Sequence, residues 1–187
     1  MFVNSPAIKL LDNHDPRQGR QLSSFAIRTL TGQDWRLLRD LRLRALHDAP
    51  AAFGSSAADA ERLSEEDWRR RLEGSAVFMA RSGELDVGLV AGIPAESPGE
   101  AELISMWVDS AWRGHGVGAA LVDHVVHWAA EMRFARLRLW VAVGNGPAER
   151  LYARLGFVRT GEVQPMGKAG FDRVEFAMLR ELAKPVR

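Results

Sequence analysis

Three glycines at alternate positions join a strand-like run to a helix-like run, and this junction restricts the fold more than any other part of the sequence. The stretch SMWVDSAWRGHGVGAALVDHVVHWAAEM covers residues 105–132 and contains Gly114, Gly116 and Gly118. Residues 101–108 before the glycines form an apolar extended run. After them, apolar residues recur at helical spacing, at Leu121, Val122, Val125, Trp128, Ala129 and Met132. The sequence therefore predicts a strand, a tight turn and a long helix in direct succession.

A glycine-rich turn of this kind suits a phosphate group, because free N–H groups and the helix dipole point at the turn. Glycine also lets a ligand approach the backbone closely, and Arg113 could add a charge-assisted contact. Two common phosphate motifs are absent. A dinucleotide fingerprint would need glycine where Ala119 stands and an acid after the next strand, which ends WVAVGN; a P-loop would need Gly-Lys-Ser/Thr. A purely structural turn remains the alternative on this pattern alone.

The rest of the chain predicts a mixed sheet with helices on its faces. Thr31 with Asp34, and Ser64 with Asp67, have the spacing of capping boxes that start two helices. The segment 49–57 breaks the pattern between them. In order, we expect one strand, two helices, three strands, a helix, a strand, a helix and two strands. The expected strands are 24–30, 75–81, 86–93, 101–108, 136–143, 157–163 and 174–182, and the later helices follow the glycines and cover 145–156.

Composition excludes several functional classes. With 25 basic and 24 acidic side chains, the chain lacks the excess of positive charge that is typical of proteins that bind nucleic acid. The basic cluster WRRRLE (68–73) is expected to be a solvated helix face. The absence of cysteine excludes disulfides, thiolate metal sites and a cysteine nucleophile, and is compatible with the cytoplasm. No run approaches about 18 apolar residues, so no membrane span is expected. Residues 1–23 lack signal-peptide features. We expect them to be an extension before a single domain over 24–187.

A second segment gives the glycine turn a more specific interpretation. RGHGVG (113–118) resembles the Arg/Gln-x-x-Gly-x-Gly/Ala motif of the GCN5-related N-acetyltransferases (GNAT), which binds the pyrophosphate of acetyl-coenzyme A in that family. NGPAERLYARLGF (145–157) is similar to the family's second signature, at the expected separation. The resemblance covers all but residues 1–23. It implies a three-layer α/β/α acyl-CoA N-acyltransferase fold with a splayed, mixed, largely antiparallel sheet of six to seven strands.

By resemblance, acetyl-CoA would bind along the splayed strand and the glycine turn. A splayed strand leaves N–H and C=O groups unpaired, and the amides of pantetheine can satisfy them. Asn145 would bind the pantetheine arm, order the loop or cap the helix. The implied binding residues are Met106, Trp107, Val108, Arg113, Gly114, His115, Gly116, Val117, Gly118 and Asn145. By alternation, Glu102, Ile104, Met106 and Val108 are expected on one face of the strand.

The resemblance also implies the chemistry, which is direct attack of a primary amine on the thioester in a ternary complex. Glu102 is the expected base, with Glu100 in reserve, and Tyr152, the only tyrosine, is the expected acid for the leaving thiolate. A backbone N–H near Val108 would stabilise the oxyanion. The acceptor pocket would form from residues 31–73 and 163–173, whose mixed charges leave small-molecule and protein amines open.

A non-catalytic acyl-CoA-binding regulatory module is the alternative function. No metal is expected, because His124 and His127 have no third ligand indicated. A homodimer is left open.

Overall fold

The computed structural model describes residues 24–167 and 173–182. Within them, seven strands form one sheet in the order β1-β2-β3-β4-β5-β7-β6. Only β4 and β5 pair in parallel, and every other neighbouring pair is antiparallel. The predicted mixed, largely antiparallel sheet is therefore confirmed. The strands are β1 (Ala26–Thr29), β2 (Ala76–Ser82), β3 (Leu85–Pro94), β4 (Glu100–Val108), β5 (Arg136–Ala142), β6 (Val158–Pro165) and β7 (Val174–Glu181).

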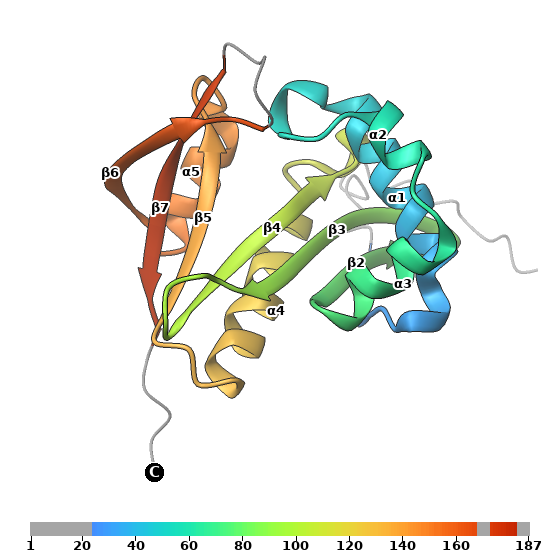
Figure 1. The fold of residues 1–187 in the computed structure, drawn as a ribbon, viewed down its shortest axis with the longest axis horizontal. Helices are drawn as coiled ribbons and strands as arrows, with labels where there is room; N and C mark the ends of the chain where they lie inside the picture. The colour runs from blue at the N-terminus through green and yellow to red at the C-terminus, as the bar shows by residue number, and fades with distance from the viewer. Residues whose placement is uncertain (1–23, 168–172, 183–187) are drawn as a thin grey trace, which may run out of the picture.

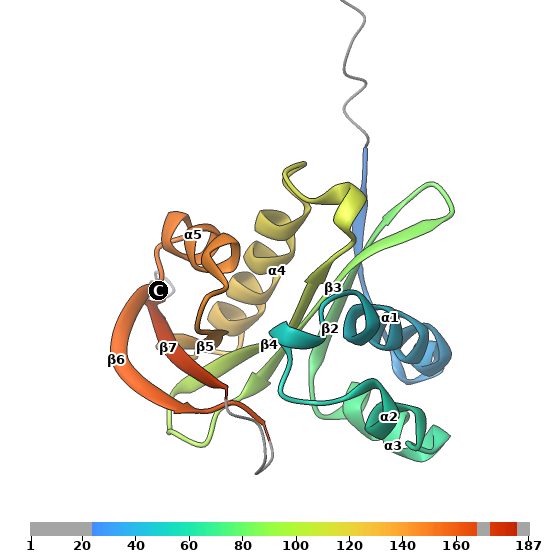
Figure 2. The ribbon, with the colours of Figure 1, turned by 90° about the horizontal axis from the view of Figure 1, so that it is seen from above.

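Helices cover both faces of the sheet, as Figures 1 and 2 show. On one face lie α1 (Trp35–Asp48), α2 (Ala57–Glu61) and α3 (Glu65–Glu73), and on the other lie α4 (Val117–Glu131) and α5 (Gly146–Arg154). Short 3-10 turns, η1 (Gly32–Asp34), η2 (Pro50–Ala52) and η3 (Ser110–Trp112), connect some of them. The three-layer α/β/α arrangement predicted from the sequence is confirmed.

Each face of the sheet has its own hydrophobic core. The α4 face buries residues such as Leu121, Val125 and Leu139, and the α1 face buries Leu41, Trp68 and Leu89. Burial of apolar side chains on both faces supplies the main driving force for this fold. Met132, expected in the apolar stripe of α4, instead caps its C-terminus and is 60% exposed.

The predicted helix starts are confirmed, and one helix was missed. The Ser64 amide donates to Asp67 Oδ2 at 3.0 Å and the Asp67 amide donates to Ser64 Oγ at 3.2 Å, and the matching box at Thr31 is also present. The segment 49–57 was expected to be irregular, but α2 begins at Ala57 with Ser56 as its N-cap. Only Ala60 of α2 is buried, so the sequence offers no apolar period there.

The sheet splays between β4 and β5. Parallel pairing runs from Glu100 opposite Arg136 to Leu103 opposite Leu139, and no further. Beyond that point β4 stays paired with β3, and β5 with β7. Figure 1 shows the two strands starting side by side and diverging. The facing edges of 104–108 and 140–142 therefore lack strand partners, as expected.

Residues 1–23, the predicted extension, lie outside the described residues, and the single domain over 24–187 stays a prediction. Among the described helices, none has the length and apolar character of a membrane span.

Candidate active site

A cavity of about 940 Å³ fills the gap where β4 and β5 diverge. Residues 102–108 of β4 and 140–142 of β5 line its walls. The glycine turn, α5 and the loop after α1 complete the lining. The same cavity therefore reaches most of the residues that the sequence predicts for the site.

A β-bulge at Ser105 changes which side chains face the cavity together. Leu89 of β3 pairs with Trp107, whereas Ala91 pairs with Ile104, so β4 has one extra residue between them. Ser105 has a φ of 58°, which is unusual for a residue other than glycine. After the bulge the faces exchange: Ile104 contacts the α1-side core, while Met106 and Val108 pack against the α4-side core. The prediction that Glu102, Ile104, Met106 and Val108 share one face is therefore wrong.

The glycine turn has a left-handed backbone and an open surface. Gly114 and Gly116 have φ values of 81° and 85°, and a Cβ atom at either would meet no atom within 4 Å. Gly116 is the N-cap of α4, and its carbonyl oxygen accepts the first helical hydrogen bond, from the Ala120 amide. The preceding N–H groups of α4 therefore point out of the helix end toward any anion in the cavity.

Gly118 is needed for a different reason from the other two glycines. A Cβ there would lie 3.2 Å from Leu151 Cδ2 and 3.3 Å from Met106 Cε. The small residue lets the first turn of α4 approach α5 and β4 closely, which keeps the end of α4 against the cavity wall.

Arg113 is held by the protein rather than left free. Its Nε donates to the Val108 carbonyl at 2.9 Å, and its guanidinium pairs with Asp48 at the end of α1. Asp48 also accepts from the Trp107 indole at 2.9 Å. These contacts join the glycine turn to α1 across 65 residues of sequence. Arg113 lines the cavity, so its remaining donors can still face a ligand.

Asn145 and Tyr152 both line the cavity from α5. Asn145 Oδ1 accepts from the Ala148 amide at 3.3 Å, so the helix N-cap role is confirmed. Tyr152 is 5% exposed, and its ring contacts Phe157 edge-on, with centroids 5.8 Å apart. Burial raises the pKa of the Tyr152 phenol. The phenol therefore stays protonated at neutral pH and available as a proton donor.

The two candidate carboxylates have opposite surroundings. Glu102 is half-buried on the cavity wall. Its pKa is raised, first by burial and then by the charge of Glu175, which outweigh the opposing effect of Arg138. Glu100 is 3% exposed, does not line the cavity, and pairs with Arg136 at 2.9 Å and Arg138 at 3.2 Å. The geometry favours Glu102 as a base and gives Glu100 a structural ion-pair network.

Two predicted binding residues do not present their side chains to the cavity. His115 is exposed, with Nδ1 3.0 Å from the Arg113 carbonyl oxygen, and Val117 is buried in the α4-side core. Their backbone amides alone remain available. In the candidate metal pair, His124 and His127 place Nδ1 near carbonyls of their own helix, at 2.8 and 2.7 Å. The described residues contain no group of three or more side chains able to hold a metal ion.

The loop after α1 lies within the range 31–73 that the sequence analysis assigned to the acceptor pocket, but its contact with the segment after β6 was not predicted. Phe53, Gly54 and Ser55 line the cavity, and the Gly54 backbone packs so closely on Gly167, after β6, that a Cβ on Gly54 would lie 3.0 Å away. No local sequence pattern indicates the contact between Gly54 and Gly167, because it joins loops more than 100 residues apart in the sequence. The contact joins a loop that lines the cavity to the segment that follows β6.

Comparison with known proteins identifies the family. The acetyltransferase (GNAT) family model matches residues 38–157, which include β2 to α5 and the whole cavity wall formed by β4, the glycine turn and β5. The chain therefore belongs to the GNAT acetyltransferase family, as its two signatures predicted.

Curated relatives match over part of their length. A probable N-acetyltransferase family 8 member 5 from Mus musculus is 35% identical over 89 residues, 46% of this chain and 39% of the relative. An N-acetylaspartate synthetase from Danio rerio is 33% identical over 100 residues, 54% of this chain and 36% of the relative. The chain thus spans about two fifths of the length of these relatives.

Solved structures share the fold over almost their whole length. A putative acetyltransferase from Salmonella typhimurium, solved with acetyl-CoA, superposes with a TM-score of 0.70 at 20% identity, covering 88% of this chain and 98% of that one. A ribosomal-protein-alanine N-acetyltransferase from Brucella melitensis gives a TM-score of 0.67 at 26% identity, covering 84% and 99%.

Proposed function

We propose that this protein binds acetyl-CoA in the splayed cavity and transfers the acetyl group to a primary amine by direct attack in a ternary complex. The observation that carries the proposal is one cavity bordered by unpaired strand edges, a helix N-terminus and two groups suited to proton transfer. The glycine turn fits a pyrophosphate, because its left-handed glycines leave open space above outward-pointing amides.

The backbone of β4 would hold the pantetheine arm. Residues Met106, Trp107 and Val108 have no partner strand on the β5 side, so those of their N–H and C=O groups that point to that side can pair with the amides of an extended ligand. Asn145, already committed to its cap, could add one contact through its amide nitrogen. When bound, acetyl-CoA supplies an activated thioester carbonyl.

Glu102 would accept the proton of the attacking amine, directly or through water. An amine with a pKa of about 10.4 is mostly protonated at neutral pH, so a base is required. A carboxylate whose pKa is raised by burial has a greater affinity for that proton than an ordinary one. A backbone N–H near Val108 would donate to the developing oxyanion. Tyr152, kept protonated by burial, would donate to the leaving thiolate.

Two measurements test this function separately. Acetyl-CoA at a hundredfold excess over its dissociation constant should stabilise the fold by about 2.7 kcal/mol, visible as a rise in melting temperature. Release of free thiol with a panel of primary amines then measures transfer. A melting shift without thiol release for any amine would identify a non-catalytic acyl-CoA-binding module, and the absence of a shift would contradict the proposal altogether. A cytoplasmic location and a homodimer stay predictions.

A further inference from the structure

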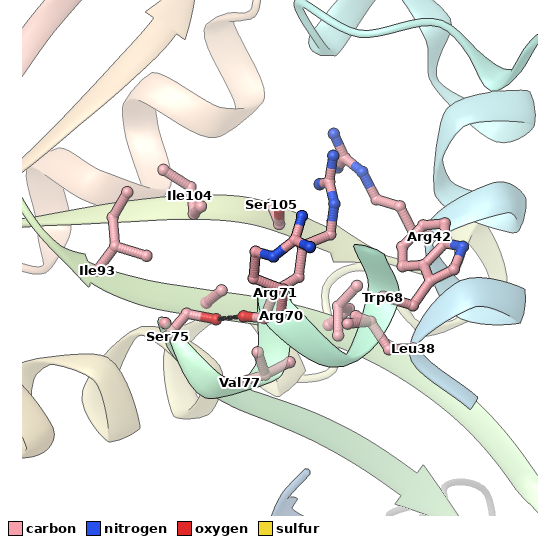
Figure 3. Close-up of a pocket in the computed structure, with 13 residues that line it drawn as sticks. Leu38, Arg42, Trp68, Arg70, Arg71, Ser75, Val77, Ile93, Ile104 and Ser105 are labelled. Carbon is pink, nitrogen blue, oxygen red and sulfur yellow. Dashed lines mark hydrogen bonds between the residues drawn. The ribbon is translucent and has the colours of Figure 1, made fainter. Parts of the chain in front are cut away.

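A second pocket of about 200 Å³ adjoins the main cavity on the α1 side of the sheet. Four residues line both the pocket and the main cavity, so the two spaces lie next to each other. They are Arg42, Arg71, Ile104 and Ser105. The remaining lining is mainly apolar, from Leu38, Trp68, Val77, Leu89, Ala91 and Ile93. Figure 3 shows Arg42 of α1 and Arg71 of α3 on the polar side of this pocket with Ser105 of β4, and Arg70 and Ser75 also line it. The side pocket is thus an apolar space with a cationic rim.

Arg42 is held in place without a carboxylate partner among the residues that the structure describes. Its Nη2 donates to Ser55 Oγ at 2.9 Å, and its guanidinium lies 4.3 Å from the centre of the Phe53 ring. Its Nη1 is buried with no hydrogen-bond partner. A buried donor without an acceptor is energetically unfavourable. An anion in the cavity could accept that bond.

Arg71 differs from the other arginines of the basic cluster. Arg69 pairs with Glu65 and Arg70 with Glu66, one helical turn earlier, as expected of a solvated face. Arg71 stacks over the Trp68 ring at 5.4 Å instead, and no ion pair is found for it within residues 24–167 and 173–182.

The positive charges of Arg42 and Arg71 repel each other in the protein without a bound anion. The pKa of Arg42 is lowered to about 10, first by burial and then by the charge of Arg71. With a pKa of about 10, Arg42 remains charged at neutral pH, so its repulsion by Arg71 is not relieved by loss of a proton from Arg42. A bound anion would remove this repulsion and complete the hydrogen bonding of Arg42 in one step.

We propose that Arg42 and Arg71 bind a carboxylate of the amine acceptor, whose apolar group enters the adjoining side pocket. This inference rests on the proposed acetyl transfer and narrows the acceptor to small amines that carry both groups, such as apolar amino acids. Guanidinium groups match carboxylates through paired N–H donors. Glu102 and Glu175 line the same cavity, and their negative charges attract the acceptor's amino group.

Matched pairs of acceptors provide the test. Each apolar amino acid is compared with its uncharged α-amide in the acetyl-CoA thiol-release assay. The wild type is expected to prefer the acid at least tenfold in kcat/KM. Arg71→Gln should reduce that preference to near unity, mainly by raising KM for the acid. Arg62→Gln removes an arginine that pairs with Asp59 on α2 and does not line either pocket, so it should keep the preference.

Each outcome of these assays either supports or contradicts the carboxylate site. Transfer to amides as fast as to acids, or an equal loss for both in Arg71→Gln, overturns the carboxylate site while leaving acetyl transfer intact. If no amine is acetylated, the melting temperature of the CoA-bound wild type and Arg71→Gln is compared with saturating acid or amide. A stabilisation by the acid alone, absent in Arg71→Gln, supports the site, and equal or no stabilisation contradicts it. A different result would contradict the proposed function: acetyl-CoA itself would fail to bind or to react.

Discussion

Replacing Glu100 and Glu102 one at a time by glutamine should produce opposite effects, although the residues stand two apart on β4. Each change keeps the shape of the side chain and removes its charge. Glu100 is buried between Arg136 and Arg138 and lies off the cavity. Glu102 is half-buried on the cavity wall, with Glu175 as a neighbouring like charge. Glu100→Gln should therefore reduce stability, and Glu102→Gln should reduce activity.

The magnitude for Glu100→Gln follows from its partners. Breaking a fully buried ion pair costs about 3–5 kcal/mol. Here the partners are less confined: the Arg136 side chain is 42% exposed, and Arg138 keeps a second carboxylate, Glu162, at 2.6 Å. We therefore expect a loss of about 2 kcal/mol in the free energy of unfolding. For a chain of this size, that corresponds to a fall of about 4–8 °C in melting temperature.

Glu102→Gln should leave the melting temperature unchanged or slightly higher at neutral pH. The pKa of Glu102 is raised in the folded protein, so its ionisation is less favourable there than in the unfolded chain. That penalty is absent at low pH, where the group is protonated in both states, and develops as pH rises through the folded pKa. Glutamine removes it.

Turnover of Glu102→Gln should fall by about 10²-fold near neutral pH, the usual scale of general base catalysis. The deficit should narrow at high pH, where more of the amine is already neutral. Thermal melts and thiol-release rates from pH 6 to 10 measure both quantities for each variant. A deficit in Glu102→Gln that stays constant across pH, or a catalytic loss confined to Glu100→Gln with normal stability, would refute this division of roles.

Three further variants test other parts of the site. Tyr152→Phe should lower turnover by about 10²-fold with acetyl-CoA affinity within a few-fold, and unchanged turnover under rate-limiting chemistry would leave Tyr152 with a structural role only. Gly116→Asp should fold, because aspartate tolerates a positive φ, yet should abolish the melting shift with acetyl-CoA by placing negative charge beside the pyrophosphate. Gly92→Ala should lower the free energy of unfolding by about 1–3 kcal/mol, because its Cβ would lie 2.5 Å from the Trp128 ring. A melting temperature equal to that of the wild type would contradict this, because it would show that the ring moves freely.

Local signals in the sequence predicted the elements because each depends on neighbours within a few residues. The Ser64–Asp67 capping box spans three positions, and the glycine turn is read from alternate residues, so neither needs tertiary information. Resemblance then supplied the splay of β4 from β5, which no periodicity reveals.

The parts that the sequence could not predict depend on contacts between distant segments. Strict alternation fails along β4 because of the extra residue at Ser105, and a serine gives no signal for a φ of 58°. Asp48 holds Arg113 and Trp107 from a position 65 and 59 residues earlier. Composition likewise could not separate Arg71 from Arg70, because the difference lies in which acids reach each guanidinium.

A crystal structure of the protein with acetyl-CoA tests the central claim most directly. The account predicts the pyrophosphate within about 3.2 Å of backbone amides between Gly114 and Ala119, a hydrogen-bond distance. It also predicts pantetheine paired with the β4 edge at 106–108, and the thioester sulfur within hydrogen-bond reach of the Tyr152 hydroxyl. A pyrophosphate bound away from the glycine turn, or a sulfur far from both Tyr152 and Glu102, would contradict it.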